Sequence, residues 1–470
     1  MKRREFFKNS SLSFLGGVFL PGSLQRSGNE GPLAYSYGKQ AKNIIFMVSD
    51  GMSIGTLNMA SLLSMRKFGR QCNWIKLYEQ QKVVRALMDT ASASSLITDS
   101  SAASSAWGGG VRVKNGVLNV SENGIHHQTI LNKFKAAGKA VGCVTTVPIT
   151  HATPAGFCIS NSSRGDQAEI ALQYLPLKFD IMMGGGLEFF SAEKRKDGRD
   201  VLSDFRSNGY KVLRNRTEMI NLKEPTGTPV LGVFTENGLP FSLDLEQDKE
   251  LQSSVPTLAE MTKQAIHHLD KNRNGFILQV EGGKVDWAAH ANDAGALIYD
   301  QLAFDDAIGI AIAFAEKNND TLVIITTDHG NSNPGLFYGD AANENFDKLQ
   351  HFKYTNEWIL SGVTNSFTPA RLIERIEGAQ GIVLSKEDAA DLLTHFKDID
   401  APGLYNPRKL PFKQLAGLQS AHTSIGWGAM DHSADYVELA MFGPGSKSLK
   451  PFVRNTDLHQ LMLHAAGLAG

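Results

Sequence analysis

Short apolar runs alternate with helical patterns along most of the chain after residue 41. Five runs rich in Val, Ile, Leu, Phe and Met have the length of strands buried on both faces of a parallel sheet: 43–48, 140–144, 276–280, 321–326 and 436–442. Helices are predicted between these runs, for example over 256–269 and over 292–315, where Asn292 or Asp293 is the expected N-cap. The alternation predicts an α/β fold with helices on both faces of a central, mostly parallel sheet.

Two stretches depart from this pattern and are expected to be additions to the sheet. Residues 187–255 are polar and rich in turn formers, and residues 335–425 carry many aromatic side chains. Within the second stretch, Thr368 before Pro369 and the capping-box pattern of 385–388 predict two helix starts. We expect 335–425 to be an insertion near the mouth of the ligand site, serving as a lid or an interface; a separate domain is the alternative.

The first 35 residues are predicted to be an export signal and linker. Arg3 and Arg4 lie in a basic start, which is followed by a short apolar core at 12–20. This order resembles the twin-arginine signal of bacteria, so we expect a periplasmic or secreted protein. No apolar run reaches the roughly 18 residues of a membrane span, so no stable membrane anchor is expected. The catalytic domain is predicted over 41–470.

Composition narrows the class of partner. Lys and Arg (47) balance Asp and Glu (48), which argues against a nucleic acid as a specific partner. Three cysteines without a CxxC pattern exclude a disulfide-dense scaffold, and Cys143 is expected to be a buried apolar residue in its strand. The histidine pairs at 126–127 and 267–268 are predicted to be surface residues, and His422 is expected to have a structural role.

Polar residues of metal-ligand type recur where the predicted strands end. Asp50, Glu281 and the pair Asp328–His329 each follow one of the apolar runs. His432 comes a few residues before the 436–442 run, so a loop at the same rim is expected to hold it. Ligands of open α/β sheets bind beyond the carboxyl ends of the strands, which makes this rim the candidate site.

Spacing and ligand type indicate several metal ions. Asp286 and His290 lie four residues apart and would share one helix face, whereas Asp328 and His329 are adjacent and could act together only from an irregular loop. Mixed His and Asp ligands suit zinc, and an all-oxygen set such as Asp50, Glu281 and a hydroxyl suits magnesium. The residues thus predict a hydrolytic site with several metals, without deciding which ligand binds which ion.

Residues 98–116 (TDSSAASSAWGGGVRVKNG) closely resemble the nucleophile segment of alkaline phosphatases. Seven further segments resemble that family in the same order along the chain: 49–52, 151–154, 163–164, 183–186, 281–290, 327–329 and 432–433. The resemblance covers about 41–446. Each motif is weak by itself, but eight in order are specific.

The resemblance implies a role for each matched residue. Ser100 corresponds to the nucleophile that becomes phosphorylated next to a zinc ion, and Arg164 to the guanidinium that clamps the phosphate. The implied ligands are Asp286, His290 and His432 for one zinc, Asp50, Asp328 and His329 for the second, and Asp50, Thr153 and Glu281 for one magnesium. Where the best-studied bacterial pattern has Asp and Lys, this chain has His151 and Trp287, as in some marine and cold-active members; both are expected beside the substrate.

The implied activity is hydrolysis of small phosphate monoesters to an alcohol and inorganic phosphate through a phosphoserine. A homodimer is compatible with the resemblance. Three alternatives stay open: a phosphodiesterase or a sulfatase on the same metal core, and a catalytically silent protein that binds metal or phosphate. Arg164 favours a terminal phosphate over a diester, and the intact Ser100 argues against a silent protein.

Overall fold

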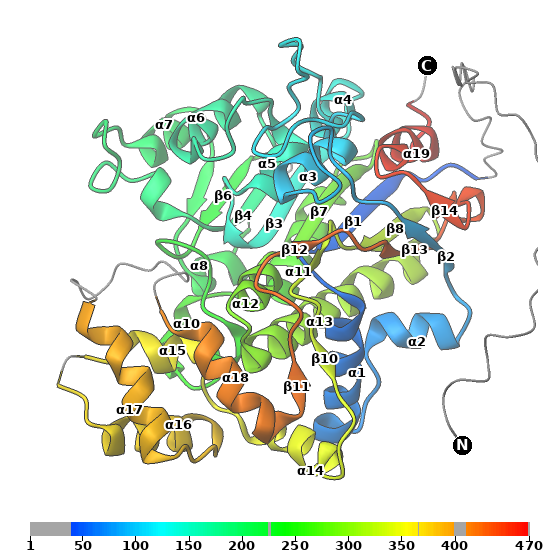
Figure 1. The fold of residues 1–470 in the computed structure, drawn as a ribbon. Helices are drawn as coiled ribbons and strands as arrows, with labels where there is room; N and C mark the ends of the chain where they lie inside the picture. Colours follow the sequence, from blue (N-terminus) through cyan, green and yellow to red (C-terminus); the bar gives the residue numbers. More distant parts are fainter. Residues whose placement is uncertain (1–38, 224–226, 365, 399–409, 469–470) are drawn as a thin grey trace, which may run out of the picture. The chain divides into compact units, whose positions relative to one another are not determined.

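The central sheet is described by a computed structural model covering residues 39–223, 227–364, 366–398 and 410–468. The predicted export segment, 1–35, lies outside the described residues. Among these residues, ten strands form one sheet in the order β14-β2-β13-β8-β1-β7-β3-β4-β6-β5 (Figure 1). The strands are β1 (Asn43–Ser49), β2 (Val84–Met88), β3 (Ala140–Pro148), β4 (Ile181–Gly185), β5 (Lys211–Leu213), β6 (Val230–Val233), β7 (Phe276–Gly282), β8 (Thr321–Thr326), β13 (Val437–Phe442) and β14 (Phe452–Val453).

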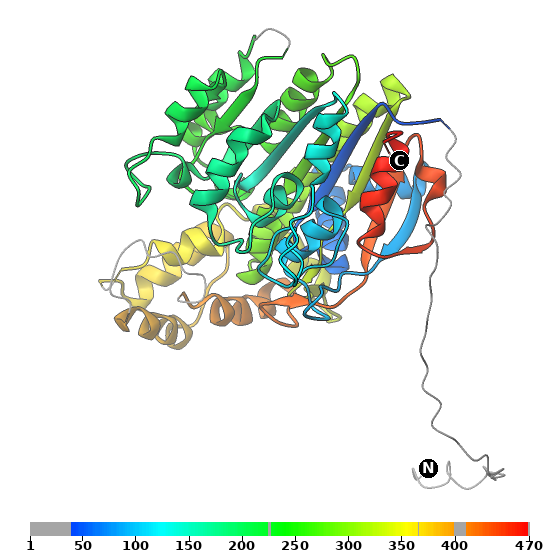
Figure 2. The ribbon, with the colours of Figure 1, turned by 90° about the horizontal axis from the view of Figure 1, so that it is seen from above.

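Helices cover both faces of the sheet, as the alternating pattern predicts (Figure 2). One face packs against α3 (Ser100–Gly108), α4 (Ile130–Ala136), α5 (Ala152–Cys158), α6 (Gln167–Leu177), α7 (Val201–Ser207) and α19 (Asp457–Ala465). The other face packs against α1 (Ile54–Phe68), α2 (Asn73–Glu79), α8 (Arg216–Ile220), α11 (Leu258–Leu269), α12 (Lys284–His290) and α13 (Ala294–Asn318). The α/β prediction is therefore confirmed, because apolar side chains from both faces of the strands are buried under helices.

The central strands follow the apolar runs closely. Every residue of β1 and of β8 is buried, and β1 pairs in parallel with β7 on one side and with β8 on the other. The helix predicted over 292–315 is α13, and Asp293 is its N-cap, accepting a hydrogen bond from the Ala296 amide. The sequence left the choice between Asn292 and Asp293 open, and the structure decides for Asp293.

One of the five predicted strands runs against the others. The sequence pattern predicts 436–442 as a strand of the parallel sheet, but β13 pairs antiparallel with β2 and with β8. The antiparallel direction turns the beginning of β13 toward the edge at which the parallel strands end. His432, which precedes β13, consequently reaches that edge, where β12 (His432–Ser433) pairs with β9 (Gly330–Asn331).

The polar stretch 187–255 also differs from expectation. It contributes β5 and β6, which extend the sheet in parallel beyond β4, so this stretch is partly an edge of the sheet rather than only an addition to it. These strands have only three and four residues, which is too short for the apolar pattern to stand out. The stretch also holds η1 (Leu187–Phe189), α9 (Ser242–Leu245) and α10 (Lys249–Ser254).

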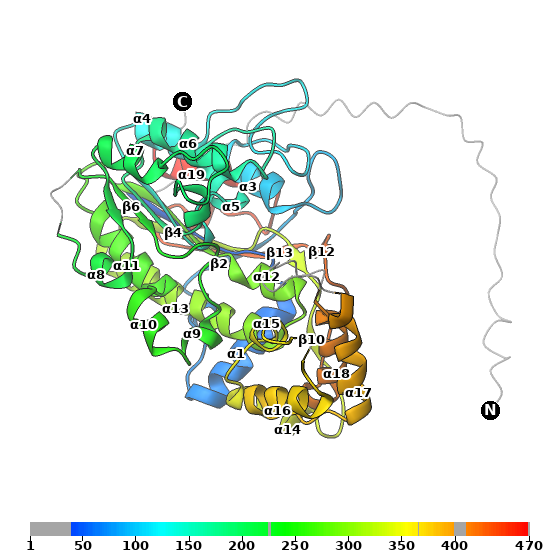
Figure 3. The same cartoon turned by 90° about the vertical axis from the view of Figure 1, so that its left-hand side faces the viewer.

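Residues 335–425 are mainly helical and gather at one end of the molecule (Figure 3). They include β10 (Gly335–Leu336), α14 (Ala342–Asp347), η2 (Lys348–His351), α15 (Asn356–Ser361), α16 (Pro369–Gln380), α17 (Lys386–Thr394), η3 (His395–Asp398), α18 (Phe412–Thr423) and, at the end, β11 (Ile425–Gly426). Both predicted helix starts are confirmed, since the Thr368 and Ser385 side chains accept hydrogen bonds from the Arg371 and Asp388 amides. A third apolar cluster joins these helices to α1, α9 and α13.

Two smaller predictions have opposite outcomes. Cys143 is buried in β3, as expected. His268 is buried, so its prediction as a surface residue is wrong; it lies three residues after Ala265 on the core-facing side of the amphipathic helix α11, whereas His267 is exposed. Within the described ranges, no helix is both long and apolar enough to cross a membrane.

Candidate metal centre

The candidate site lies where neighbouring parallel strands end. β8, β1, β7 and β3 are adjacent in the sheet, with Val48 of β1 paired to Glu281 of β7 and to Thr326 of β8. Asp50 directly follows β1, and one residue separates the end of β8 from Asp328. Asp50, Glu281 and Asp328 are at most 1 % exposed. Sheet register thus places three carboxylates together in a buried position.

A first group of metal-ligand type combines α12 with the segment before β13. Ligand atoms of Asp286, His290 and His432 lie within 4.8 Å of one another. The helical spacing brings His290 Nε2 to 3.4 Å from Asp286 Oδ2, and His432 Nε2 lies 3.5 Å from the other carboxylate oxygen. The shared helix face predicted for Asp286 and His290 is therefore present.

A second group lies beside the predicted nucleophile. Asp50, Asp328 and His329 bring their ligand atoms within 4.8 Å, with His329 Nε2 3.5 Å from Asp50 Oδ1 and 3.2 Å from Asp328 Oδ2. The Ser100 Oγ is 3.3 Å from the same Nε2. Ser100 is 1 % exposed and is the first residue of α3, where the partial positive charge of the helix N-terminus favours a developing alkoxide.

The histidine rings are oriented as metal ligands usually are. His290 Nδ1 donates to the Met430 carbonyl at 2.7 Å and His432 Nδ1 to the Thr98 carbonyl at 2.9 Å. With the proton on Nδ1, a metal ion would bind each ring through Nε2, and the two Nε2 atoms are 3.1 Å apart. Burial alone would lower the pKa of His432, but the Asp286 carboxylate outweighs it and raises the pKa to about 9, so this position favours a positive charge, which a bound cation would supply.

The carboxylates point to the same conclusion. Asp50 Oδ1, Glu281 Oε1 and Asp328 Oδ2 are buried without a hydrogen-bond partner among the described residues. Burial, together with the charges of Asp328, Asp286 and Glu281, raises the pKa of Asp50 well above its usual range, and burial raises the pKa of Glu281 to about 8. Buried carboxylates this close are stable as anions only when cations compensate them, so the residues present fit metal ions.

A third group adjoins the second. Carboxylate oxygens of Asp50 and Glu281 and a ring nitrogen of His151 lie within 4.8 Å. Thr153 Oγ1 donates to Asp50 Oδ2 at 3.4 Å, which places a hydroxyl beside the same carboxylates. His151 Nε2 accepts a hydrogen bond from Arg164 Nη2 at 3.1 Å, so its proton is on Nδ1 and the Nδ1 lone pair is not free for a metal. An oxygen set that includes Thr153 is therefore the better fit.

Arg164 is held in place from two sides. Its Nη1 donates to Asp99 Oδ2 at 3.0 Å, and its Nη2 donates to His151. Burial alone would raise the pKa of Asp99, but the Arg164 charge and hydrogen bonds from Ala102 and Ser101 outweigh it and lower the pKa. Burial, and then the Arg164 charge, lowers the pKa of His151 to about 3, so this ring is neutral.

Two cavities meet at the centre. The smaller, of about 480 Å³, is lined by Thr98, Asp99, Ser100 and His432. The larger, of about 930 Å³, includes His151 and Trp287, whose rings contact edge to face with centroids 6.1 Å apart. Both cavities are bordered by Arg164, Asp286, His290 and Asp431.

All twelve residues singled out in the sequence lie in or beside this centre, while three supporting residues were missed. Asp99 anchors Arg164, Asn331 Nδ2 donates to Asp286 Oδ1 at 2.7 Å, and Thr145 Oγ1 donates to Glu281 Oε2 at 2.5 Å. Asp99 lies inside the segment 98–116 and Asn331 two residues after the segment 327–329, which is a signal that could have found them. Thr145 lies inside an apolar strand and carries no such signal.

Comparison with known proteins gives one consistent result. A sequence profile described as "Alkaline phosphatase" matches residues 41–468. "Alkaline phosphatase 4" of Bacillus subtilis is 30% identical over 97% of this chain and 97% of that protein, and the "Repressible alkaline phosphatase" of Saccharomyces cerevisiae is 34% identical over 85% of this chain and 75% of that protein. Among solved structures, Thermus thermophilus alkaline phosphatase superposes with a TM-score of 0.86, at 32% identity, over 96% of both chains.

Proposed function

Because this chain belongs to the alkaline phosphatase family of metal-dependent phosphomonoesterases, we propose that Ser100 is its nucleophile and that it works with two zinc ions and one magnesium ion. The observation that carries the proposal is the position of Ser100 Oγ, 3.3 Å from His329 Nε2 and within the cavity that Arg164 also lines. A nucleophile, a phosphate clamp and metal ligands converge there.

Ligand chemistry supports the assignment of the ions. Asp286, His290 and His432 would hold one zinc, and Asp50, Asp328 and His329 the other, since both sets mix imidazole with carboxylate. Asp50, Thr153 and Glu281 would hold magnesium through oxygen alone. When bound, the ions would lower the pKa of the Ser100 hydroxyl and stabilise the charge on the attacking and leaving oxygens.

The chain's own residues then perform two displacements. Arg164 binds two oxygens of the phosphoryl group with its planar fork, while Asp99 and His151 fix the orientation of that fork. Ser100 Oγ attacks phosphorus; the Ser–O–P bond forms, the bond to the leaving oxygen breaks, and the alcohol departs with a proton. In the second displacement water attacks the phosphoserine: a new bond forms between the water oxygen and phosphorus, the bond between phosphorus and Ser100 Oγ breaks, Ser100 Oγ takes up a proton, and inorganic phosphate leaves.

A rate comparison tests the proposed activity. The purified protein is assayed at alkaline pH with p-nitrophenyl phosphate and with bis-p-nitrophenyl phosphate, before chelation and after restoration of zinc and magnesium. We expect fast, metal-restorable monoester cleavage and slow diester cleavage. Preference for the diester would establish the phosphodiesterase alternative, and absence of any turnover would leave the silent binding protein.

We further propose that the protein acts outside the cytoplasm, exported by the twin-arginine-type segment at 1–35. Arg3 and Arg4 support this, because the pathway requires that pair. Replacing both arginines with lysine should retain phosphatase activity in the cytoplasmic fraction. Unchanged export of this variant would refute the pathway.

A homodimer is also proposed. Ile54 and Tyr436 are 65% and 62% exposed and line one surface depression with Leu87, so a second copy of the chain could cover apolar side chains here. Light scattering of the purified protein should give twice the chain mass, and Tyr436→Glu should lower it. A single-chain mass for the wild type would refute the dimer.

A further inference from the structure

The two cavities at the metal centre have different positions relative to the nucleophile. Ser100 borders only the smaller cavity, whereas Arg164, Asp286 and His290 border both. In an in-line displacement the leaving group lies opposite the attacking oxygen. If Ser100 attacks as proposed above, the alcohol part of the substrate therefore extends into the larger cavity.

The larger cavity is far bigger than a phosphate requires. Its volume of about 930 Å³ lies at the upper end of the range for whole small-molecule ligands, about 300–1,000 Å³. Phe189 of η1 and Trp287 of α12 supply aromatic rings, and Leu410 and Met430 supply further apolar surface. Phe189 and Trp287 are only partly buried: each packs against a core cluster on one side, and Lys284 Nζ lies 4.7 Å from the Trp287 ring centroid. These walls suit a planar ring on the leaving group.

Hydrogen-bonding groups accompany the apolar walls. Asn237 is exposed and lines the cavity, and its side-chain amide has no hydrogen bond to another residue in the described ranges. An amide offers one donor and one acceptor side by side, which matches the edge of a heteroaromatic base. A purely hydrocarbon ring would not use this group.

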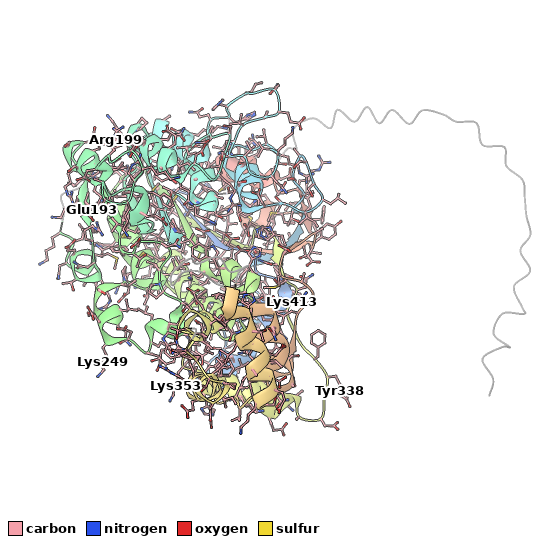
Figure 4. All side chains as sticks on the ribbon, turned by 60° about the vertical axis from the view of Figure 1, so that its left-hand side comes forward. Glu193, Arg199, Lys249, Tyr338, Lys353 and Lys413 are labelled. Carbon is pink, nitrogen blue, oxygen red and sulfur yellow. The ribbon has the colours of Figure 1, made fainter. Side chains whose placement is uncertain are left out.

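The charges of the outer wall argue against a second phosphate. Lys413, which Figure 4 labels, lies in the first turn of α18, at the end of the helix. It lines the cavity and has no ion pair with any other residue that the structure describes. Glu188 lines the same cavity. Among the described residues of the outer wall, the Glu188 carboxylate thus offsets the Lys413 cation and leaves no excess of positive charge for a second phosphate.

We propose that this cavity is a nucleoside subsite, so that the enzyme prefers phosphate monoesters whose alcohol carries a heteroaromatic base, such as 5′-nucleotides. Phe189 and Trp287 would stack on the base, and Asn237 would bind its edge. The inference rests on the proposed function, since it requires the alcohol to leave on the side opposite Ser100. Phe189 and Asn237 become specificity-determining residues that play no part in the phosphoryl chemistry.

Adenosine 5′-monophosphate and ribose 5-phosphate form a matched pair of probes. Both release a primary alcohol of ribose, and they differ at the anomeric carbon, where the nucleotide carries the base and ribose 5-phosphate a hydroxyl. We expect kcat/KM to be about tenfold higher for the nucleotide, because stacking on aromatic side chains contributes at this level. We expect similar kcat values, because both substrates form the same phosphoserine. Equal kcat/KM values would overturn the subsite, whereas no hydrolysis of either compound would instead overturn the proposed function.

Variants locate the effect within the cavity. Phe189→Leu keeps the apolar packing but removes the ring, and Asn237→Ala removes the amide; each should lower kcat/KM for the nucleotide about three- to tenfold and leave ribose 5-phosphate unchanged. Tyr338→Ala is the matched control, since Tyr338 is 99% exposed, does not line the cavity and projects away from the fold (Figure 4). Equal losses for both probes in both cavity variants would show a structural role and refute base recognition.

Discussion

The edge of the sheet and the helical stretch 335–425 are built on different principles. At the edge, buried strands fix Asp50, Glu281 and Asp328 by backbone register, and these side chains have almost no exposure. Residues 335–425 bury a separate apolar cluster. Their described residues that line the larger cavity lie at the start of η3 and at or just before the start of α18: His395, Leu410, Pro411, Lys413 and Gln414. Position at the edge is thus dictated by the whole sheet, whereas the outer wall depends on local helix packing.

The two regions are therefore suited to different tasks, the edge of the sheet to metal binding and the helical stretch to contacts with the leaving group. Metal ligands must hold their distances within a few tenths of an ångström, which a parallel sheet with both faces covered provides. Contacts to a leaving group tolerate variation, so a helical addition can supply them. Changes at the edge should therefore affect catalysis, and changes in 335–425 should affect substrate choice or stability.

Removing the metals should have the largest effect on the edge. Chelation is expected to reduce monoester hydrolysis by at least about 10⁴-fold, because the nucleophile and the leaving oxygen lose their charge compensation. The melting temperature should also fall, since buried carboxylates such as Asp50 would be left uncompensated. Rates and thermal unfolding, measured with metal analysis before and after restoration, check this. Full activity in verified metal-free protein would contradict the assignment.

The second largest effect is expected for Ser100→Ala, which should lower kcat by at least about 10³-fold and leave the fold unchanged. The matched change in 335–425 is Ser385→Ala, which removes the N-cap of α17. This substitution should lower the free energy of unfolding by about 1 kcal/mol and leave kcat unchanged. Steady-state kinetics and thermal unfolding of both variants test the contrast, and normal turnover in Ser100→Ala would exclude it as the nucleophile.

Arg164→Lys should lower kcat/KM for monoesters by about 10- to 100-fold and weaken inhibition by inorganic phosphate, because Lys cannot bind two oxygens with a planar fork. Arg371→Lys, on α16, is the control in 335–425, where the guanidinium stacks over Phe367. It should change neither constant. If phosphate inhibition were unaltered in Arg164→Lys, the phosphate clamp would have to be another group.

Asp244→Asn should have the smallest effect, at the junction of the two regions. Asp244 of α9 accepts hydrogen bonds from the Thr355 amide and hydroxyl. The charged groups that interact with it include Glu357, Lys284, Asp293 and Asp300. Burial raises the pKa of Asp244 to about 6. A raised pKa stabilises the fold below the unfolded value near 3.9 and loses that contribution as pH rises through about 6.

Between pH 4 and pH 8 the free energy of unfolding of the wild type should therefore fall by at most about 3 kcal/mol relative to that of Asp244→Asn. Urea unfolding of both proteins at several pH values measures this difference. Monoester hydrolysis should be unaffected, because Asp244 lies outside both cavities at the metal centre. A stability difference that does not change with pH would show that Asp244 is ionised throughout.

Sequence predicted the edge better than its surroundings for a physical reason. The buried strands β1, β7 and β8 need continuous apolar runs, and their ends need polar residues, so both features are visible in the sequence. The direction of β13 is a long-range property, because its pairing with β2 and β8 joins distant segments and leaves no local signal. The short strands β5 and β6, the last two in the order of the sheet, have too few residues to show a period.

The contacts that support the site residues could not be predicted for the same reason, because they join segments that are distant in the sequence. Ser100, Arg164 and the ligands stand in motifs, but the bond between Asp99 and Arg164 joins residues 65 positions apart. Thr145 binds Glu281 across neighbouring strands, from a position that reads only as part of an apolar run. Partnerships of this kind depend on which strands become neighbours, which local patterns do not encode.

The antiparallel return of β13 also constrains how the protein is made. His432 bonds to the Thr98 carbonyl, 334 positions earlier in the chain, and completes a ligand group with Asp286 and His290. A nascent chain that has not yet released residue 432 from the ribosome cannot assemble this group. Metal binding by this one group must then follow the synthesis of His432, and a ribosome that stops before residue 432 yields a product without this ligand group.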